Sequence, residues 1–72
     1  MAQLNSAQYD ALEDAITRST RISVFRRGTE YVIVPLALRA VNGREMIEAR
    51  NPATGQVLKI FLDEMEAVEV VK

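Results

Sequence analysis

The hydrophobic pattern divides the chain into one helical segment and a longer segment of strands. Over residues 5–18, Leu12 and Ile16 recur at helical spacing on one face, while acidic residues occupy other positions. Asn5 and Gln8 have the spacing of a capping box, in which each side chain binds the backbone N–H of the other residue. This pattern predicts an amphipathic helix over residues 5–18.

Beyond residue 20, short apolar runs alternate with turn signals, which is typical of strands. Pro35 breaks the second run, and because proline cannot donate to a ladder it marks an edge, a bulge or the start of a strand. Asn42-Gly43 is a strong hairpin signal, and its two-residue turn pairs Leu36 with Ala49 on one face. The predicted strands are 21–27, 30–34, 36–41, 44–50, 56–62 and 67–71, with a turn or short 3₁₀ segment at 63–66.

This order predicts an α+β fold that is mostly β, with the N-terminal helix followed by a small antiparallel barrel of the SH3 or Sm type. The barrel has five or six strands and covers residues 21–71 of a single domain, residues 1–72. A chain this short buries about three fifths of its unfolded surface. It has no cysteine and no histidine, so neither a disulfide nor a typical zinc site supports this thin core. Of the usual ways to stabilise a small domain, namely a disulfide, a metal ion or self-association, only self-association remains.

The strand predicted over residues 56–62 is apolar on both faces. Val57 and Phe61 lie on one face, and Leu58, Ile60 and Leu62 lie on the other. Such a strand is either central in a sheet or part of an interface. We therefore expect Val57 and Phe61 to be interface candidates, toward another copy of the chain or toward a protein partner.

Charge is distributed unevenly although the net charge is −1. Residues 1–17 carry three acids and no base, residues 18–59 carry eight bases and three acids, and residues 60–72 carry four acids and one base. Seven of the nine bases are arginines, whose planar guanidinium binds phosphate and carboxylate in bidentate fashion. Two interpretations stay open: a surface that binds phosphate groups, or solvated strand positions that pair with the acidic ends. The candidate residues for binding a ligand or nucleic acid are Arg26, Arg27, Arg39, Arg44 and Arg50, with Met46 as an apolar platform beside Phe61.

Residues 11–71 resemble the WYL domain of bacterial regulators. Residues 11–16 resemble the opening helix of that family, Ile22-Ser23-Val24-Phe25 its first strand, and Val34-Pro35-Leu36 its proline step. Glu45-Met46-Ile47 stands where the name-giving tryptophan, tyrosine and leucine would be. Leu62-Asp63-Glu64-Met65 stands where the family has a leucine, an aspartate, an arginine and an isoleucine.

The resemblance implies an Sm-like barrel that acts as a ligand sensor or nucleic-acid binder in transcriptional regulators and defence systems. Arginines near the last strand of that family help to bind negatively charged ligands, but the matching positions here are Leu58, Phe61 and Glu64. The usual basic ligand site is therefore lost or remodelled. We expect a non-catalytic binding or regulatory module that senses a ligand or nucleic acid. The alternative is a structural or protein-interaction subunit that acts through self-association or by docking on a partner protein.

No residue pattern indicates an enzyme. The serines have no histidine to activate them, the three glycines are scattered, and the acidic residues near the end lack the spacing of an EF-hand. We therefore expect no catalytic residue, no metal and no cofactor. The longest apolar run has eight residues and contains Pro35, far short of the roughly 20 that a membrane helix needs, and the first residues have no signal-peptide pattern. We expect a cytoplasmic protein that does not cross a membrane.

Overall fold

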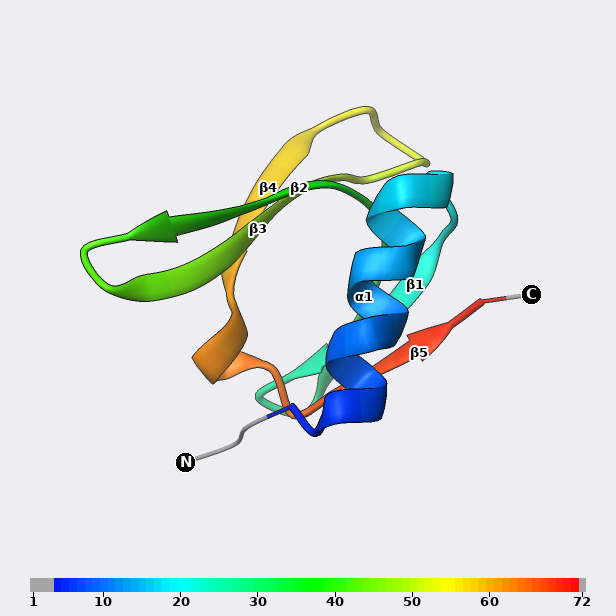
Figure 1. The fold of residues 1–72 in the computed structure, drawn as a ribbon. Coiled ribbons are helices and arrows are strands. Elements are labelled where there is room, and N and C mark those ends of the chain that lie inside the picture. The colour runs from blue at the N-terminus through cyan, green and yellow to red at the C-terminus, as the bar shows by residue number, and fades with distance from the viewer. Residues whose placement is uncertain (1–3, 72) are drawn as a thin grey trace.

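The computed structural model describes residues 4–71 and shows one helix followed by five strands. Residues 1–3 and 72 of the predicted domain lie outside the described residues. The strands form one antiparallel sheet in the order β4-β3-β2-β1-β5, and α1 packs against β2 and β5 (Figure 1). The predicted α+β fold, mostly β with an N-terminal helix, is confirmed. The elements are α1 (Ser6–Arg18), β1 (Ile22–Arg26), β2 (Thr29–Val41), β3 (Arg44–Arg50), β4 (Val57–Phe61), the 3₁₀ helix η1 (Leu62–Glu64) and β5 (Ala67–Val70).

Helix α1 begins with the capping box that the sequence predicts. The backbone N–H of Gln8 donates to Asn5 Oδ1 at 2.8 Å, and the backbone N–H of Asn5 donates to Gln8 Oε1 at 3.3 Å. The helix ends at Ser19, which has a left-handed conformation with φ of 56°. Leu12 and Ala15 form the buried face, so the helix packs on the sheet by the stripe that its periodicity indicates.

Strand β2 is the longest strand and belongs to both halves of the sheet. Residues 29–33 pair with β1, whereas residues 34–41 pair with β3. The predicted strands 30–34 and 36–41 are therefore one strand, and the sheet has five strands, the lower of the two predicted numbers. The register shifts between Pro35 and Ala37, which marks a β-bulge that bends the strand. The bend curls the sheet into an open barrel, with β4 and β5 as its edges.

The bulge changes the pairing of β2 with β3 beyond the hairpin. Near the turn, Leu38 pairs with Ile47, as a two-residue turn at Asn42-Gly43 requires. Farther along, Ala49 pairs with Pro35, so the predicted pairing of Leu36 with Ala49 is wrong. The bulge inserts one extra residue, and Leu36 is 45% exposed instead of sharing the buried face with Ala49.

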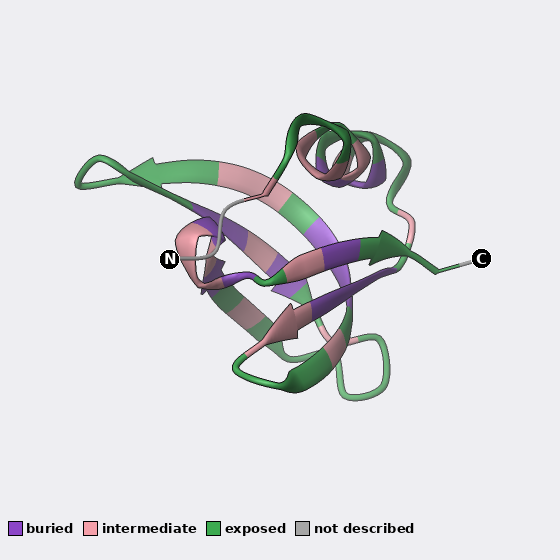
Figure 2. Cartoon of the chain, turned by 90° about the horizontal axis from the view of Figure 1, so that it is seen from below, coloured by how far each residue is buried: buried purple, intermediate pink, exposed green. Residues whose placement is uncertain are grey.

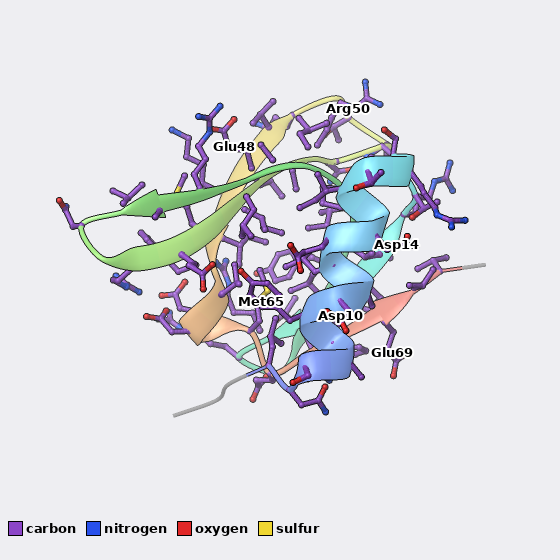
Figure 3. All side chains as sticks on the ribbon, in the orientation of Figure 1. Asp10, Asp14, Glu48, Arg50, Met65 and Glu69 are labelled. Atoms are coloured by element: carbon purple, nitrogen blue, oxygen red, sulfur yellow. The ribbon has the colours of Figure 1, made fainter. Side chains whose placement is uncertain are left out.

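The core lies between the inner face of the curled sheet and α1. Figure 2 shows that the buried parts of the strands and of the helix face this interior. Met65, between η1 and β5, is fully buried in this core and lies to one side of α1 in Figure 3. Strand β4 lies at an edge of the sheet rather than in its centre: Ile60 packs into the core, while Val57 is 57% exposed. The largest fully buried side chains include Leu12, Ile22, Ile33, Ile47, Ile60 and Met65.

Candidate ligand-binding site

Within residues 4–71, five of the seven arginines form ion pairs and two do not. Within residues 4–71, no carboxylate lies at ion-pair distance from Arg21 or Arg50. Most of the positive charge in the middle of the chain is neutralised, because acids from both ends of the chain fold onto it. The pairs are Arg18–Asp14 at 3.0 Å, Arg26–Glu64 at 3.6 Å, Arg27–Glu64 at 3.8 Å, Arg39–Glu48 at 2.5 Å and Arg44–Asp63 at 2.8 Å.

Arg26 and Arg27 lie at the turn between β1 and β2, beside acidic residues of the later chain. Both guanidinium groups share the carboxylate of Glu64. The backbone N–H of Gly28, in the same turn, donates a hydrogen bond at 3.1 Å to the side chain of Glu66, which comes just before β5. Because two acids accompany the two bases, this arginine pair presents no net positive surface to a ligand.

Arg44 is held on the outer face of the sheet by two neighbours. Its Nε and Nη2 donate to the two carboxylate oxygens of Asp63 at 2.9 and 2.8 Å. Its guanidinium carbon also lies 3.8 Å from the centroid of the Phe61 ring. These hydrogen bonds from Arg44 hold the pKa of the Asp63 carboxyl below its ordinary value. Arg44 is thus engaged within the protein, and Phe61, a predicted interface residue, is half-buried against it.

Met46 is buried rather than part of an open platform. It is 6% exposed, and its cross-strand neighbours are Arg39 of β2 and Phe61 of β4. Arg39 is paired with Glu48, two residues along β3. Arginine side chains cover apolar neighbours with their methylene groups while the charged end stays in water. The expectation that Met46 offers an exposed surface to a ligand is therefore wrong.

Arg21 and Arg50 line one hollow of about 450 Å³. The hollow lies around Val34 of β2, which pairs with Arg50 at the end of β3, and it extends to Ser19 and Arg21 just after α1 (Figure 1). Among the residues that the structure describes, no acidic residue lines it. Two cations therefore face this space with no opposing charge. The other lining residues are Ser19, Val34, Leu36, Pro52 and Gly55.

Arg50 is left without an acidic partner by the arrangement of β3. Its cross-strand neighbours on the outer face are Val34 and Val57, which are apolar. The acid two residues before it on the same face, Glu48, is bound to Arg39. Arg50 projects from the end of β3 away from the interior (Figure 3). Its guanidinium is thus free to bind a ligand in the hollow.

Hydrogen bonds within the loop after β3 shape one wall of the hollow. The backbone N–H of Asn51 donates to the carbonyl of Gln56 at 2.8 Å, and the N–H of Gly55 donates to the carbonyl of Asn51 at 2.7 Å. The side chain of Asn51 accepts a further bond from the N–H of Ala53 at 2.8 Å. A loop closed on itself in this way holds Pro52 and Gly55 in the lining of the hollow.

The sequence singles out Arg50 as a candidate site residue, whereas it indicates Arg21 only as a member of the arginine-rich middle segment. This charge pattern is the signal that could have included Arg21. The pairing of the other arginines and the position of the start of β1 and the end of β3 along β2 depend on the tertiary fold. No local motif indicates that Arg21 and Arg50 share a hollow.

A second hollow, of about 300 Å³, lies between α1 and the β2–β3 hairpin. Its polar groups satisfy one another: Tyr9 donates its hydroxyl hydrogen to Glu45 at 2.5 Å, and Arg44 binds Asp63. The hydrogen bond to Glu45 raises the pKa of Tyr9 to about 12. These groups connect the helix to the hairpin. Among the residues that line this hollow, the one charge outside an ion pair is the negative charge of Glu45, so the hollow offers no unpaired cation to an anionic ligand.

Within residues 4–71, no cluster of three or more His, Cys, Asp or Glu side chains is placed to hold a metal ion. No helix in this range is long and apolar enough to cross a membrane. Comparison of the chain with protein-family models, curated proteins and solved structures finds no match. The function of the hollow is therefore inferred from its own residues.

The Tyr9–Glu45 hydrogen bond predicts an unusual tyrosine titration. In a Tyr31→Phe background Tyr9 is the sole tyrosine, so phenolate absorbance against pH reports its pKa directly. Glu45→Gln should lower the pKa of Tyr9 from about 12 toward the ordinary value of about 10, because the carboxylate that opposes ionisation is gone.

The same bond sets a pH window for stability. Because folding raises the pKa of Tyr9, the stabilisation is complete below the unfolded-state pKa of about 10 and is lost as pH rises toward about 12. Glu45→Gln should show a weaker loss of stability over this range. An identical Tyr9 titration with and without the Glu45 carboxylate would contradict the assignment.

Proposed function

We propose that the chain is a non-catalytic binding and regulatory module that holds an anionic ligand in the hollow of Arg21 and Arg50. The observation that carries this proposal is that the two arginines without an ion pair in residues 4–71 both line that hollow. Arginine binds carboxylate and phosphate in bidentate fashion, and such charged hydrogen bonds are stronger than neutral ones. Among residues 4–71, no acid lines the hollow to compete with the ligand.

The resemblance to the WYL domain supports the same class of function through a different set of residues. At the positions of the family's ligand-binding arginines, Leu58 is half-buried against the core and Phe61 is packed against Arg44. The third position, Glu64, binds Arg26 and Arg27. The proposed site lies elsewhere, beside the end of α1, so the ligand-sensing role is retained here with a remodelled site.

Titration with pyrophosphate tests the proposal. The NMR signals of the Arg21 and Arg50 Nε–Hε groups should shift, while those of the ion-paired arginines should not. Arg21→Gln with Arg50→Gln should weaken pyrophosphate binding at least about tenfold. The reason is that a hydrogen bond to a charged group contributes about 1.5–3 kcal/mol, and about 1.4 kcal/mol corresponds to a factor of ten.

The matched control is Arg18→Gln with Arg27→Gln, which makes the same change in net charge at two exposed arginines outside the hollow. Equal weakening by both double variants would mean that only long-range attraction is at work, and would overturn the site. If pyrophosphate did not bind even at low salt, the proposed function as an anion-binding module would be overturned. If a twelve-nucleotide single-stranded DNA bound more tightly than pyrophosphate, with an affinity that fell steeply with salt, the ligand would be a nucleic-acid backbone instead.

A second candidate function is assembly with further copies of the chain, and the two edges of the sheet favour it. Strand β4 carries Lys59 and the 57% exposed Val57, whereas β5 carries Glu69. By register, Lys59 and Glu69 lie on the same outer face of the sheet. Pairing of β4 with β5 of a second copy brings these opposite charges together and covers Val57. A head-to-tail contact of this kind closes into a ring or extends as a filament.

Sedimentation of charge-reversal variants tests assembly. The wild type should form oligomers, Lys59→Glu should weaken them, and adding Glu69→Lys should restore them, because the pair is re-formed with its charges exchanged. Val57→Glu is a more suitable apolar probe than Phe61→Glu, since Phe61 packs within its own chain. A wild-type monomer at high concentration would exclude assembly.

A further inference from the structure

Leu36 lies at the β-bulge and is exposed in the lining of the hollow. In the bulge, Pro35 pairs with Ala49 and the next pair along the strand is Ala37 with Glu48, so Leu36 has no partner of its own. In a regular ladder Leu36 would lie opposite Ala49, which is fully buried. The bulge instead leaves Leu36 45% exposed at the hollow. Bulges re-aim side chains in this way and are over-represented beside functional sites.

The hollow combines this exposed leucine with other apolar groups and with two guanidinium groups. Val34 and Pro52 line it together with Leu36, and Arg21 and Arg50 are its charged residues. An inorganic anion satisfies the arginines but leaves the apolar surface of Leu36 in water, where it is unfavourable. A ligand that joins an anion to an apolar body covers both kinds of surface.

On the basis of the proposed function, we infer that the ligand is an organic acid with one carboxylate or phosphate group attached to an aliphatic or aromatic body. The anionic group binds Arg21 and Arg50, which accept either chemistry. The apolar body packs against Leu36 and its apolar neighbours in the hollow. A volume of about 450 Å³ lies in the range of small-molecule sites in proteins. The arginines set the sign of the ligand's charge, and Leu36 sets its apolar part.

A series of alkyl carboxylates tests this inference. Butanoate, hexanoate and octanoate carry the same charge, so a gain in affinity along the series comes from the apolar body. Each added methylene should tighten binding by about two- to fourfold, the upper value being that for complete burial. The Nε–Hε signals of Arg21 and Arg50 report binding. Octyl phosphate, compared with octanoate, identifies the preferred anionic group.

Two variants separate the apolar contact from the charged one. Leu36→Ser should remove most of the gain along the series, with a much smaller effect on pyrophosphate, which has no apolar part. Val41→Ser is the matched control, because Val41 is 40% exposed on the same strand but does not line the hollow. This control should keep the full gain. Since both side chains are exposed, both variants should unfold in urea close to the wild-type midpoint.

The outcomes distinguish the inference from the function on which it rests. Equal affinity for butanoate and octanoate, with pyrophosphate still bound at Arg21 and Arg50, would overturn the inference and leave the proposed function in place. A gain along the series that persists in Leu36→Ser would also overturn it. Failure of every anion to shift the two arginine signals would overturn the proposed function itself.

Discussion

The bend of β2 is the constraint on which the rest of the structure depends: the strand changes partner between Ile33 and Val34, and the bulge begins at the next residue, Pro35. Pro35 has no backbone N–H to donate to a ladder. The bulge takes up the extra residue and bends the strand, so that both halves of the sheet turn their apolar faces toward α1. Ile33 on one side of the bend and Ile47 opposite the other side are both fully buried. A straight β2 would separate these two halves of the core.

The ion pairs of the folded chain matter more for its surface potential than for its stability. Exposed pairs such as Arg18–Asp14 contribute about 0–1 kcal/mol each. Their larger effect is to cancel charge, because acids from both ends of the sequence lie beside the arginine-rich middle. In the part of the chain that the structure describes, Arg21 and Arg50 have no such acidic partner, and the bend in β2 places Leu36 in the same hollow. The candidate site thus contains the two arginines whose charge is not neutralised by an acid within residues 4–71.

Features that depend on neighbouring residues in the sequence were predictable, and features that depend on the tertiary fold were not. The Asn5 capping box and the Asn42-Gly43 turn are local, and both form as expected. The exposure of Leu36 depends on the β-bulge. In the sequence, Pro35 indicates an edge, a bulge or the start of a strand without distinguishing among them. Met46 is buried because long side chains on neighbouring strands cover it, which alternation along one strand does not show.

The same distinction explains why the site was predicted only in part. The sequence indicates Arg50 as one of several strand arginines. Arg50 does not pair with the nearby Glu48 because Glu48 forms its ion pair with Arg39. Arg21 shares the hollow with Arg50 only because the sheet brings the start of β1 and the end of β3 to the same part of β2, around Val34. Alternating patterns predict which side of a strand a residue faces, and they carry no information on which acid a given arginine will bind.

A crystal structure of the chain with pyrophosphate bound tests the central claim most directly, because it locates the anion. If the anion binds in the hollow, we expect pyrophosphate oxygens at hydrogen-bond distance, about 2.7–2.9 Å, from the guanidinium groups of both Arg21 and Arg50. Pyrophosphate bound at the Arg26–Arg27 turn, or on the outer face beside Arg39 and Arg44, with the hollow left empty, would contradict this claim.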